Sequence, residues 1–94
     1  MSYDKNESRF LLKIGQRIRI LRETHNMTQE QLSFKCGLHR TYISSVERGE
    51  RNIALINLEK ILAALQVSLA QFFTDLPDEE SETNEPKMGN PSSE

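Results

Sequence analysis

The chain has 94 residues, 36% apolar and 28% charged, with a net charge of −2. That is enough for one small domain with a modest core and too little for a deep catalytic cleft. No apolar run reaches the length of a membrane span, the first residues lack a secretory pattern, and the lone Cys36 excludes an intrachain disulfide. We therefore expect a cytoplasmic protein that does not contact membranes.

The segment from about 8 to 74 is predicted to be all helical, because it contains no proline and no stretch that alternates with period two. Apolar residues at helical spacing, from Phe10 to Leu21, predict a first helix over 8–25. We expect residues 1–7 to form a flexible arm.

Three further helix starts share one pattern: an apolar residue, a capping residue, then a second apolar residue five places after the first. Thr28 with Gln31 and Ser68 with Gln71 are typical capping boxes, whereas His39 is a poorer cap. With the apolar positions that follow, these starts predict helices over 28–36, 40–48 and 69–74, and apolar residues at helical spacing from Leu55 to Leu65 predict another helix over 55–65.

Only a short turn containing Gly37 separates the second and third predicted helices, as in a helix-turn-helix unit. Ile43 and Val46 would face inward from the third helix, which leaves an outward side rich in Arg, Thr and Ser. Such a side suits a DNA groove. Pattern alone also allows an ordinary surface helix in a small bundle.

The motifs that carry a family resemblance cover most of this segment. They are Thr28-Gln29-Glu30-Gln31-Leu32, Gly37-Leu38, Tyr42-Ile43-Ser44-Ser45-Val46-Glu47-Arg48-Gly49 and Arg51-Asn52. The chain resembles the phage-repressor/Cro (Xre-type) helix-turn-helix family over residues 10–74. Within that family it is most similar to the controller proteins of restriction–modification systems.

The resemblance implies an all-α, five-helix, lambda-repressor-like fold and a sequence-specific transcription regulator without cofactors. Such a controller binds double-stranded operator half-sites as a homodimer, and regulates its own gene and the endonuclease gene. Two dimers on tandem sites and RNA polymerase are the further partners implied. A phage or plasmid repressor and an antitoxin share the fold and remain alternatives, and a protein–protein adaptor is a rival outside DNA binding.

The third helix supplies the expected base contacts. Arg40 can bind guanine through O6 and N7, and Thr41 offers a hydroxyl and a methyl in the same first turn. Ser44 and Ser45 lie one turn later and can reach a base edge or a phosphate.

The expected contacts to the DNA backbone flank this helix. They are Gln29, Tyr42, Arg48, Arg51 and Asn52. Gln29 lies at a helix amino terminus, where free N–H groups favour phosphate. For Tyr42 the ring can pack beneath the helix or the hydroxyl can reach the backbone.

Arg22 and Glu47 match positions that often form an ion pair beneath the DNA-facing surface in the family. We expect Arg22 to hold Glu47 and so to orient the third helix; the alternative is a contact from Arg22 to phosphate.

The stretch from Ile61 to Phe73 has more apolar residues than one inward stripe requires. We expect the surplus to form the dimer interface; the alternative is that these residues pack into a dense monomer core. The residues expected at this interface are Leu65, Val67, Leu69, Phe72 and Phe73. The sequence departs from the family at Ala54, where the fourth helix lacks its usual cap, and at the outward Phe34.

Charge divides the chain in two. Residues 1–74 carry eleven Lys/Arg against seven Asp/Glu, whereas residues 75–94 carry one Lys against seven Asp/Glu and hold all three prolines. The basic part favours a polyanionic partner. We expect the acidic tail to be disordered, either as a solvated segment or as a weak competitor of DNA phosphate.

No enzyme is expected from this sequence. His25 and His39 have no Cys or carboxylate at metal-ligand spacing, so we expect no metal site. Ser44, Ser45 and His39 lack an acid to orient the histidine and a nucleophile turn. Cys36 is expected to be a small core residue.

Overall fold

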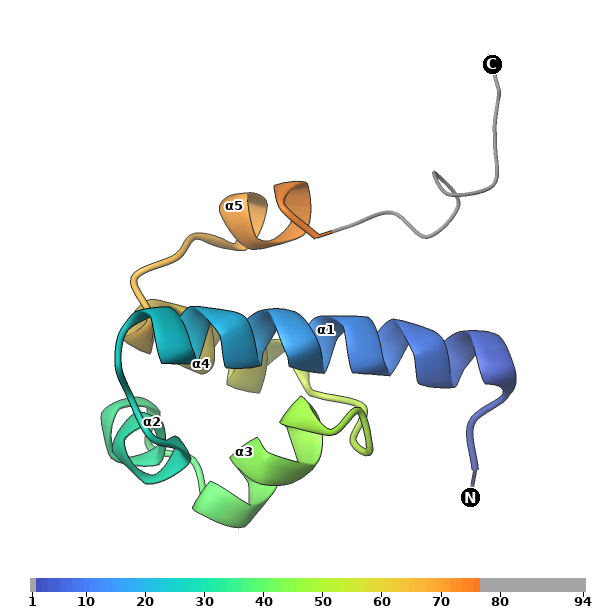
Figure 1. Cartoon of the computed structure of the whole chain (residues 1–94), viewed down its shortest axis with the longest axis horizontal. Helices are drawn as coiled ribbons and strands as arrows, with labels where there is room; N and C mark the ends of the chain where they lie inside the picture. Colours follow the sequence, from blue (N-terminus) through green and yellow to red (C-terminus); the bar gives the residue numbers. More distant parts are fainter. Residues whose placement is uncertain (1, 77–94) are drawn as a thin grey trace.

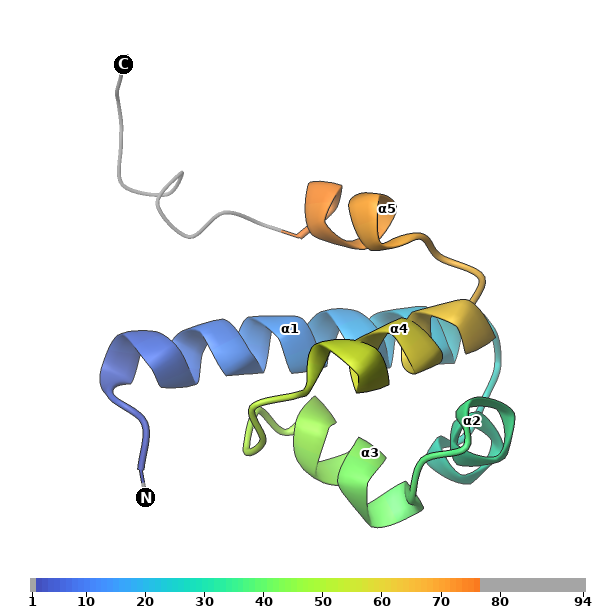
Figure 2. The ribbon, with the colours of Figure 1, turned by 180° about the vertical axis from the view of Figure 1, so that it is seen from behind.

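The computed structural model describes residues 2–76 as five helices and, within that range, no strand. The helices are α1 (Lys5–Thr24), α2 (Gln29–Cys36), α3 (Arg40–Glu47), α4 (Leu55–Ala64) and α5 (Leu69–Thr74). The long α1 crosses the whole molecule, with α2 and α3 on one side of it and α5 on the opposite side (Figure 1). α4 passes in front of α1 in the view from behind (Figure 2), and its neighbours are α2 and α5. The all-α prediction is confirmed.

The first helix begins earlier than predicted. Asp4 caps it: the Glu7 N–H donates to Asp4 Oδ1 at 2.8 Å, and the Asp4 N–H donates to Glu7 Oε1 at 3.0 Å. This capping box satisfies two amide groups that would otherwise lack partners, so α1 starts at Lys5. The predicted arm over 1–7 is therefore too long, because residues 5–7 are helical.

Not all of the other four helices have a side-chain cap at the amino terminus. Thr28 and Gln31 form the complete box predicted for α2. At α5 only half of the predicted box forms, because Ser68 accepts from the Gln71 N–H while the Gln71 side chain donates to Asp75 Oδ2 at 2.7 Å. The α3 and α4 caps, His39 and Ala54, make no side-chain capping bond.

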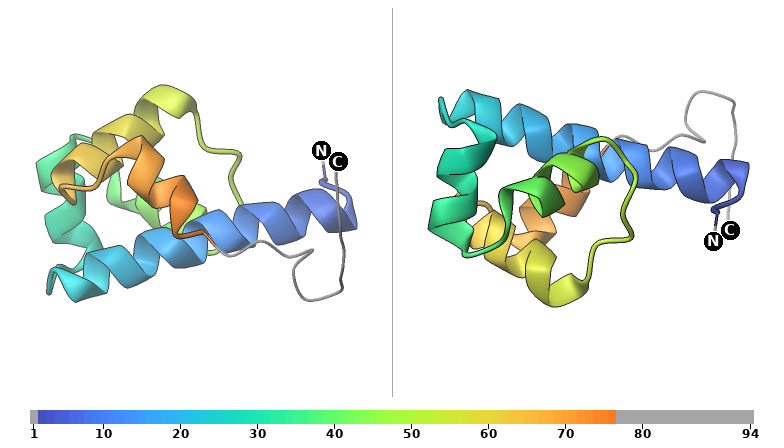
Figure 3. Two further views of the ribbon diagram at one scale, coloured as in Figure 1. Left: turned by 90° about the horizontal axis from the view of Figure 1, so that it is seen from above. Right: turned by 90° about the horizontal axis from the view of Figure 1, so that it is seen from below.

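Apolar side chains from all five helices meet in one core. The fully enclosed ones are Ile18, Leu32, Ile43, Val46, Ile61, Leu62, Leu65 and Phe72. Phe10, which we expected to share the inward face of α1, is 50% exposed. The amino-terminal end of α1 extends beyond the other helices (Figure 3), and Phe10 in this half of the helix is only partly covered.

A glycine sets the distance between α1 and α3. A Cβ atom on Gly15 would lie 2.2 Å from the Val46 carbonyl oxygen and 2.7 Å from that of Glu47. Only a residue without a side chain lets the end of α3 approach α1 this closely. The position of α3 therefore depends on Gly15, which the sequence pattern did not single out.

The first two residues of the predicted tail lie within the described part of the chain. Asp75 accepts from Arg17 Nη2 at 3.0 Å, and Leu76 is partly buried against the core. The prediction of an acidic disordered tail over 75–94 lies, from residue 77 onward, outside the described residues.

Candidate nucleic-acid interface

The α2–α3 pair has helix-turn-helix geometry. Gly37 ends α2 in the left-handed conformation, with φ of 75°, and its N–H donates to the Ser33 carbonyl at 2.8 Å. The chain turns through Leu38, which packs on the core, and starts α3 at Arg40. As a result α3 runs along one face of the molecule, seen from below in Figure 3.

The four expected base contacts differ in how they are held. Arg40 is exposed in the first turn of α3. Thr41 Oγ1 is hydrogen-bonded to His39 Nδ1 at 3.1 Å, and Ser44 Oγ accepts from Arg48 Nη1. The Ser45 hydroxyl donates to the Tyr42 carbonyl at 2.9 Å, which turns it back onto its own helix.

A buried ion pair fixes α3 from below. Arg22 is 8% exposed and Glu47 is 6% exposed, and two N–H groups of Arg22 donate to the two carboxylate oxygens at 2.6 and 2.9 Å. Arg22 also donates to the Met27 carbonyl at 2.7 Å, in the turn before α2. One guanidinium thus joins α1, the start of α2 and the end of α3, as expected for a structural role and not for phosphate binding.

Hydrogen bonding and burial have opposite effects on the pKa of Arg22. The hydrogen bond to Glu47 raises the pKa of Arg22, and burial opposes it to a lesser extent. Arg22 therefore stays charged at any physiological pH. A buried charge of this kind is tolerated only while its partner remains in place.

Gln29 joins the same network. Its Nε2 donates to Glu47 Oε1 at 3.1 Å, so the carboxylate accepts three hydrogen bonds in all. An amide nitrogen carries two hydrogens, so a second one remains for another acceptor. Gln29 is thus held in place before any ligand arrives.

Tyr42 uses both ends of its side chain. The ring packs partly against the core and lies 5.0 Å beneath the Arg51 guanidinium, and the hydroxyl oxygen accepts from Asn57 Nδ2 at 3.1 Å. The hydroxyl hydrogen stays available as a donor. Sequence reasoning missed Asn57, although it is the only polar residue in the run Leu55-Ile56-Asn57-Leu58.

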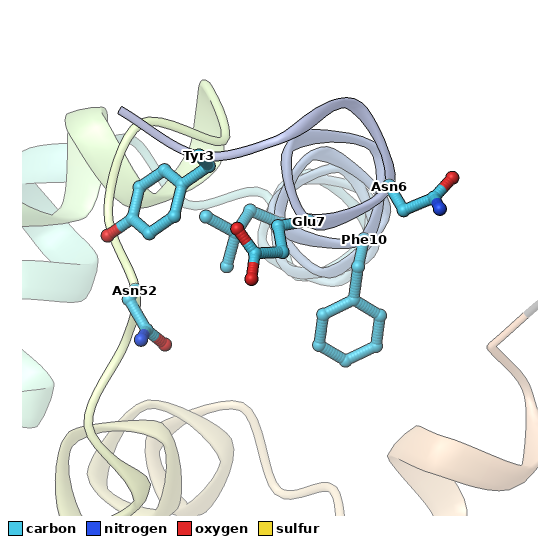
Figure 4. Close-up of a pocket in the computed structure, with 6 residues that line it drawn as sticks. Tyr3, Asn6, Glu7, Phe10 and Asn52 are labelled. Atoms are coloured by element: carbon cyan, nitrogen blue, oxygen red, sulfur yellow. The ribbon is translucent and has the colours of Figure 1, made fainter. Parts of the chain in front are cut away.

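Asn52 lies beside the amino terminus of α1. With Tyr3, Asn6 and Glu7 it lines a pocket of about 350 Å³, in which the Tyr3 hydroxyl points toward the loop that carries Asn52 (Figure 4). The single carboxylate of this pocket belongs to Glu7, which the capping box already uses. Phe10 and Leu11 also line the pocket, so it combines apolar walls with a few polar groups.

A second surface, where α1, α4 and α5 meet, is apolar and adjoins this pocket through Phe10, Leu11 and Asn52. Phe10, Leu55 and Phe73 line a groove of about 250 Å³, and Leu55 is 77% exposed. The expected dimer residues divide here: Leu69 and Phe73 are exposed and Val67 is partly buried, but Leu65 and Phe72 are fully enclosed in the monomer core. The prediction was wrong for these two because the turn before α5 directs them inward.

The one cysteine of the chain, Cys36, is buried. Burial raises the pKa of the Cys36 thiol, which keeps it protonated. Among residues 2–76 no three His, Cys, Asp or Glu side chains lie close enough to hold a metal ion. Over the same range no helix has the length and apolar character needed to cross a bilayer.

Comparison with known proteins points to one class. The helix-turn-helix family matches residues 18–72. The control protein C.BamHI of Bacillus amyloliquefaciens is 56% identical over 57 residues, which is 60% of this chain and 70% of the relative. The crystal structure of the restriction-modification controller protein C.AhdI from Aeromonas hydrophila superposes with a TM-score of 0.65 at 44% identity, covering 67% of this chain and 96% of that one. The controller C.Esp1396I, crystallised as a tetramer on its natural 35-base-pair operator, gives 0.66 at 46% identity, covering 71% and 90%.

Proposed function

The chain belongs to the helix-turn-helix family, and we propose that it is a sequence-specific transcription regulator of the restriction–modification controller type. The observation that carries this proposal is the outward face of α3, where an exposed Arg40 stands on a helix held by the buried Arg22–Glu47 pair. Such a helix can enter a major groove without rearrangement. In this role the protein works in the cytoplasm and catalyses no reaction.

We assign base reading chiefly to Arg40, because it is the expected base contact whose side chain is not already hydrogen-bonded within the described residues. Thr41 and Ser44 can exchange their internal bonds for a base edge at little cost, since a hydroxyl both donates and accepts. Ser45 is bonded to its own helix and is the weakest candidate of the four.

Contacts to the DNA backbone lie on both sides of α3. Gln29 retains one amide hydrogen for phosphate at the start of α2, and Tyr42 retains its hydroxyl hydrogen. Arg48, Arg51 and Asn52 follow α3 and provide two positive charges and an amide. Contacts of this kind set register and salt dependence, not sequence preference.

We propose that two copies associate through the apolar groove and its rim. The groove residues Phe10, Leu55 and Phe73 and the exposed Leu69 and Ile56 are large apolar side chains on a small protein. A twofold interface would pair this surface with itself and present two α3 helices to one palindromic site. Assembly of two dimers on tandem sites and contact with RNA polymerase would follow from the same controller role.

Selection of duplexes from sheared genomic DNA of the source tests this function. Purified protein should retain a symmetric site upstream of its own gene, and an endonuclease or methyltransferase gene nearby would identify the system. A toxin gene or prophage genes beside that site would favour an antitoxin or repressor instead. No recovery above background at low salt would refute DNA binding and favour the adaptor.

A matched pair of arginine variants separates base reading from backbone binding. Arg40→Ala should cost about 1–3 kcal/mol at the selected site and relax one base position. Arg51→Ala should weaken binding to all sequences alike and reduce the salt slope by about 1. An unchanged sequence preference in Arg40→Ala would exclude Arg40 as a base reader.

A further inference from the structure

The turn that ends α3 carries an ion pair on the surface assigned to DNA. Arg48 Nε and Nη2 donate to Glu50 Oε2 and Oε1, each at 3.0 Å. The remaining nitrogen, Nη1, donates to Ser44 Oγ. All three nitrogens of this guanidinium are therefore engaged within the protein, and the edge that would fit a phosphate is occupied by a carboxylate.

The backbone of this turn holds Glu50 next to Arg48. Gly49 has φ of 75°, its N–H donates to the Val46 carbonyl at 3.0 Å, and the Glu50 N–H donates to the Ser45 carbonyl at 2.9 Å. A Cβ on Gly49 would lie 2.8 Å from Leu12 Cα, so the turn also rests against α1. Because the backbone is fixed, pairing the two side chains restricts less conformational freedom than in a flexible loop.

Glu50 is the exposed acidic residue of the segment that we assign to DNA contacts. Between residues 40 and 52 the acidic residues are Glu47 and Glu50. Glu47 is buried and bound by Arg22 and Gln29, whereas Glu50 is exposed. The Arg48 hydrogen bonds lower the pKa of the Glu50 carboxyl, so it remains ionised beside the DNA.

We propose that Glu50 limits the affinity of the interface by occupying the Arg48 guanidinium, which it must release before Arg48 can bind a phosphate. The proposal rests on the DNA-binding function proposed above and deepens it. As a consequence, the sequence-independent part of the affinity for DNA is weaker. Arg48 does not contact the phosphate backbone until a site with good base contacts makes the exchange of Glu50 for phosphate favourable. Base reading then accounts for a larger share of the total affinity.

Salt-dependent binding of Glu50→Gln to a labelled random-sequence duplex tests this directly. Glutamine keeps the size of the side chain but removes the charge that holds Arg48. We expect binding roughly twofold to fivefold tighter, the range of an exposed ion pair. The plot of log K against log salt should steepen by about 0.9, as for one additional neutralised phosphate.

Two further variants separate this device from simple repulsion between Glu50 and DNA. Glu59→Gln removes an exposed carboxylate from α4, away from α3, and should change neither affinity nor slope. In an Arg48→Gln background, Glu50→Gln should no longer steepen the slope, since the cation to be released is gone.

The outcomes are distinct. If the wild-type protein binds the duplex and Glu50→Gln binds it with the same affinity and salt slope, the proposal is overturned but DNA binding is not. An equal gain with and without Arg48 would replace the pairing device by plain charge repulsion. Failure of the wild-type protein to bind any duplex would remove the function on which the proposal rests.

Discussion

The two sides of α1 are stabilised in different ways. On the α2–α3 side, charged and amide groups are buried in a connected network around Glu47, and the side chains that face outward are polar apart from Phe34. On the α4–α5 side, the core is apolar throughout and large apolar groups such as Leu55 and Phe73 remain exposed. The buried polar groups of the first side are paired within the monomer, whereas the second side leaves several large apolar side chains together on the surface.

This difference explains why the two sides should respond differently to substitution. Removing a member of a buried network leaves another polar group without a partner, so the folded state is strongly destabilised. Removing an exposed apolar group leaves the monomer almost unchanged and affects only what binds to it.

Glu47→Ala should have the largest effect, because it leaves the Arg22 guanidinium buried without its counterion. We expect a loss of about 3–5 kcal/mol in the free energy of unfolding, measured by urea denaturation. The matched control is Glu59→Ala on the exposed face of α4, which should change stability by less than about 0.5 kcal/mol. Similar midpoints for the two variants would show that the network contributes little.

A double replacement can separate stability from positioning in the same network. Arg22→Met with Glu47→Leu should recover most of the lost stability, since apolar pairs often replace buried ion pairs without penalty. DNA binding should remain weakened, because Gln29 loses the acceptor that holds it. Full recovery of DNA binding would contradict the positioning role.

Gly15→Ala should be the next largest change, as it places a Cβ atom against two carbonyl oxygens at the end of α3. Overpacking of this kind costs about 1–3 kcal/mol, which outweighs the better helix propensity of alanine. The control is Gln16→Ala, which changes the next residue, whose side chain is exposed. A stabilised Gly15→Ala protein would mean that α3 does not approach α1 as closely as described.

Leu55→Ser tests the apolar side. Leu55 should contribute about 1 kcal/mol from each of two copies, so its loss should weaken dimerisation by about thirtyfold in sedimentation equilibrium. Phe34→Ser is the matched control, because Phe34 is 81% exposed but lies on α2. If Phe34→Ser weakened dimerisation and Leu55→Ser did not, the two sides would have been assigned the wrong way round.

Sequence patterns predicted the elements well where a local signal existed. The caps at Thr28 and Ser68 and the turn at Gly37 mark helix boundaries through hydrogen bonds within a few residues, and the structure follows them, although the box at Ser68 is only half formed. Asp4 and Glu7 form the same box but precede the apolar repeat, so the start of α1 was placed too late.

The candidate site was harder to predict, because its geometry depends on contacts far apart in the sequence. The Arg22–Glu47 pair followed from a family resemblance, but the bond from Asn57 to Tyr42 and the approach at Gly15 join separate helices and leave no local pattern. Leu65 and Phe72 are buried whereas Phe73 is exposed. This difference depends on the orientation of α5, which composition alone does not determine.

Ala54→Ser should have the smallest effect and the opposite sign. Ala54 is the N-cap of α4, with extended φ and ψ of −70° and 145°, and it offers no side-chain acceptor to the first turn. A serine there can accept from the Asn57 N–H, which should add about 1 kcal/mol to the free energy of unfolding. Thr28→Ala, which removes the cap of α2, should lose about as much in the same urea titration. If Thr28→Ala loses stability but Ala54→Ser gains none, the start of α4 is already fixed by the Asn57–Tyr42 bond, and the two sides of the molecule are coupled at this point.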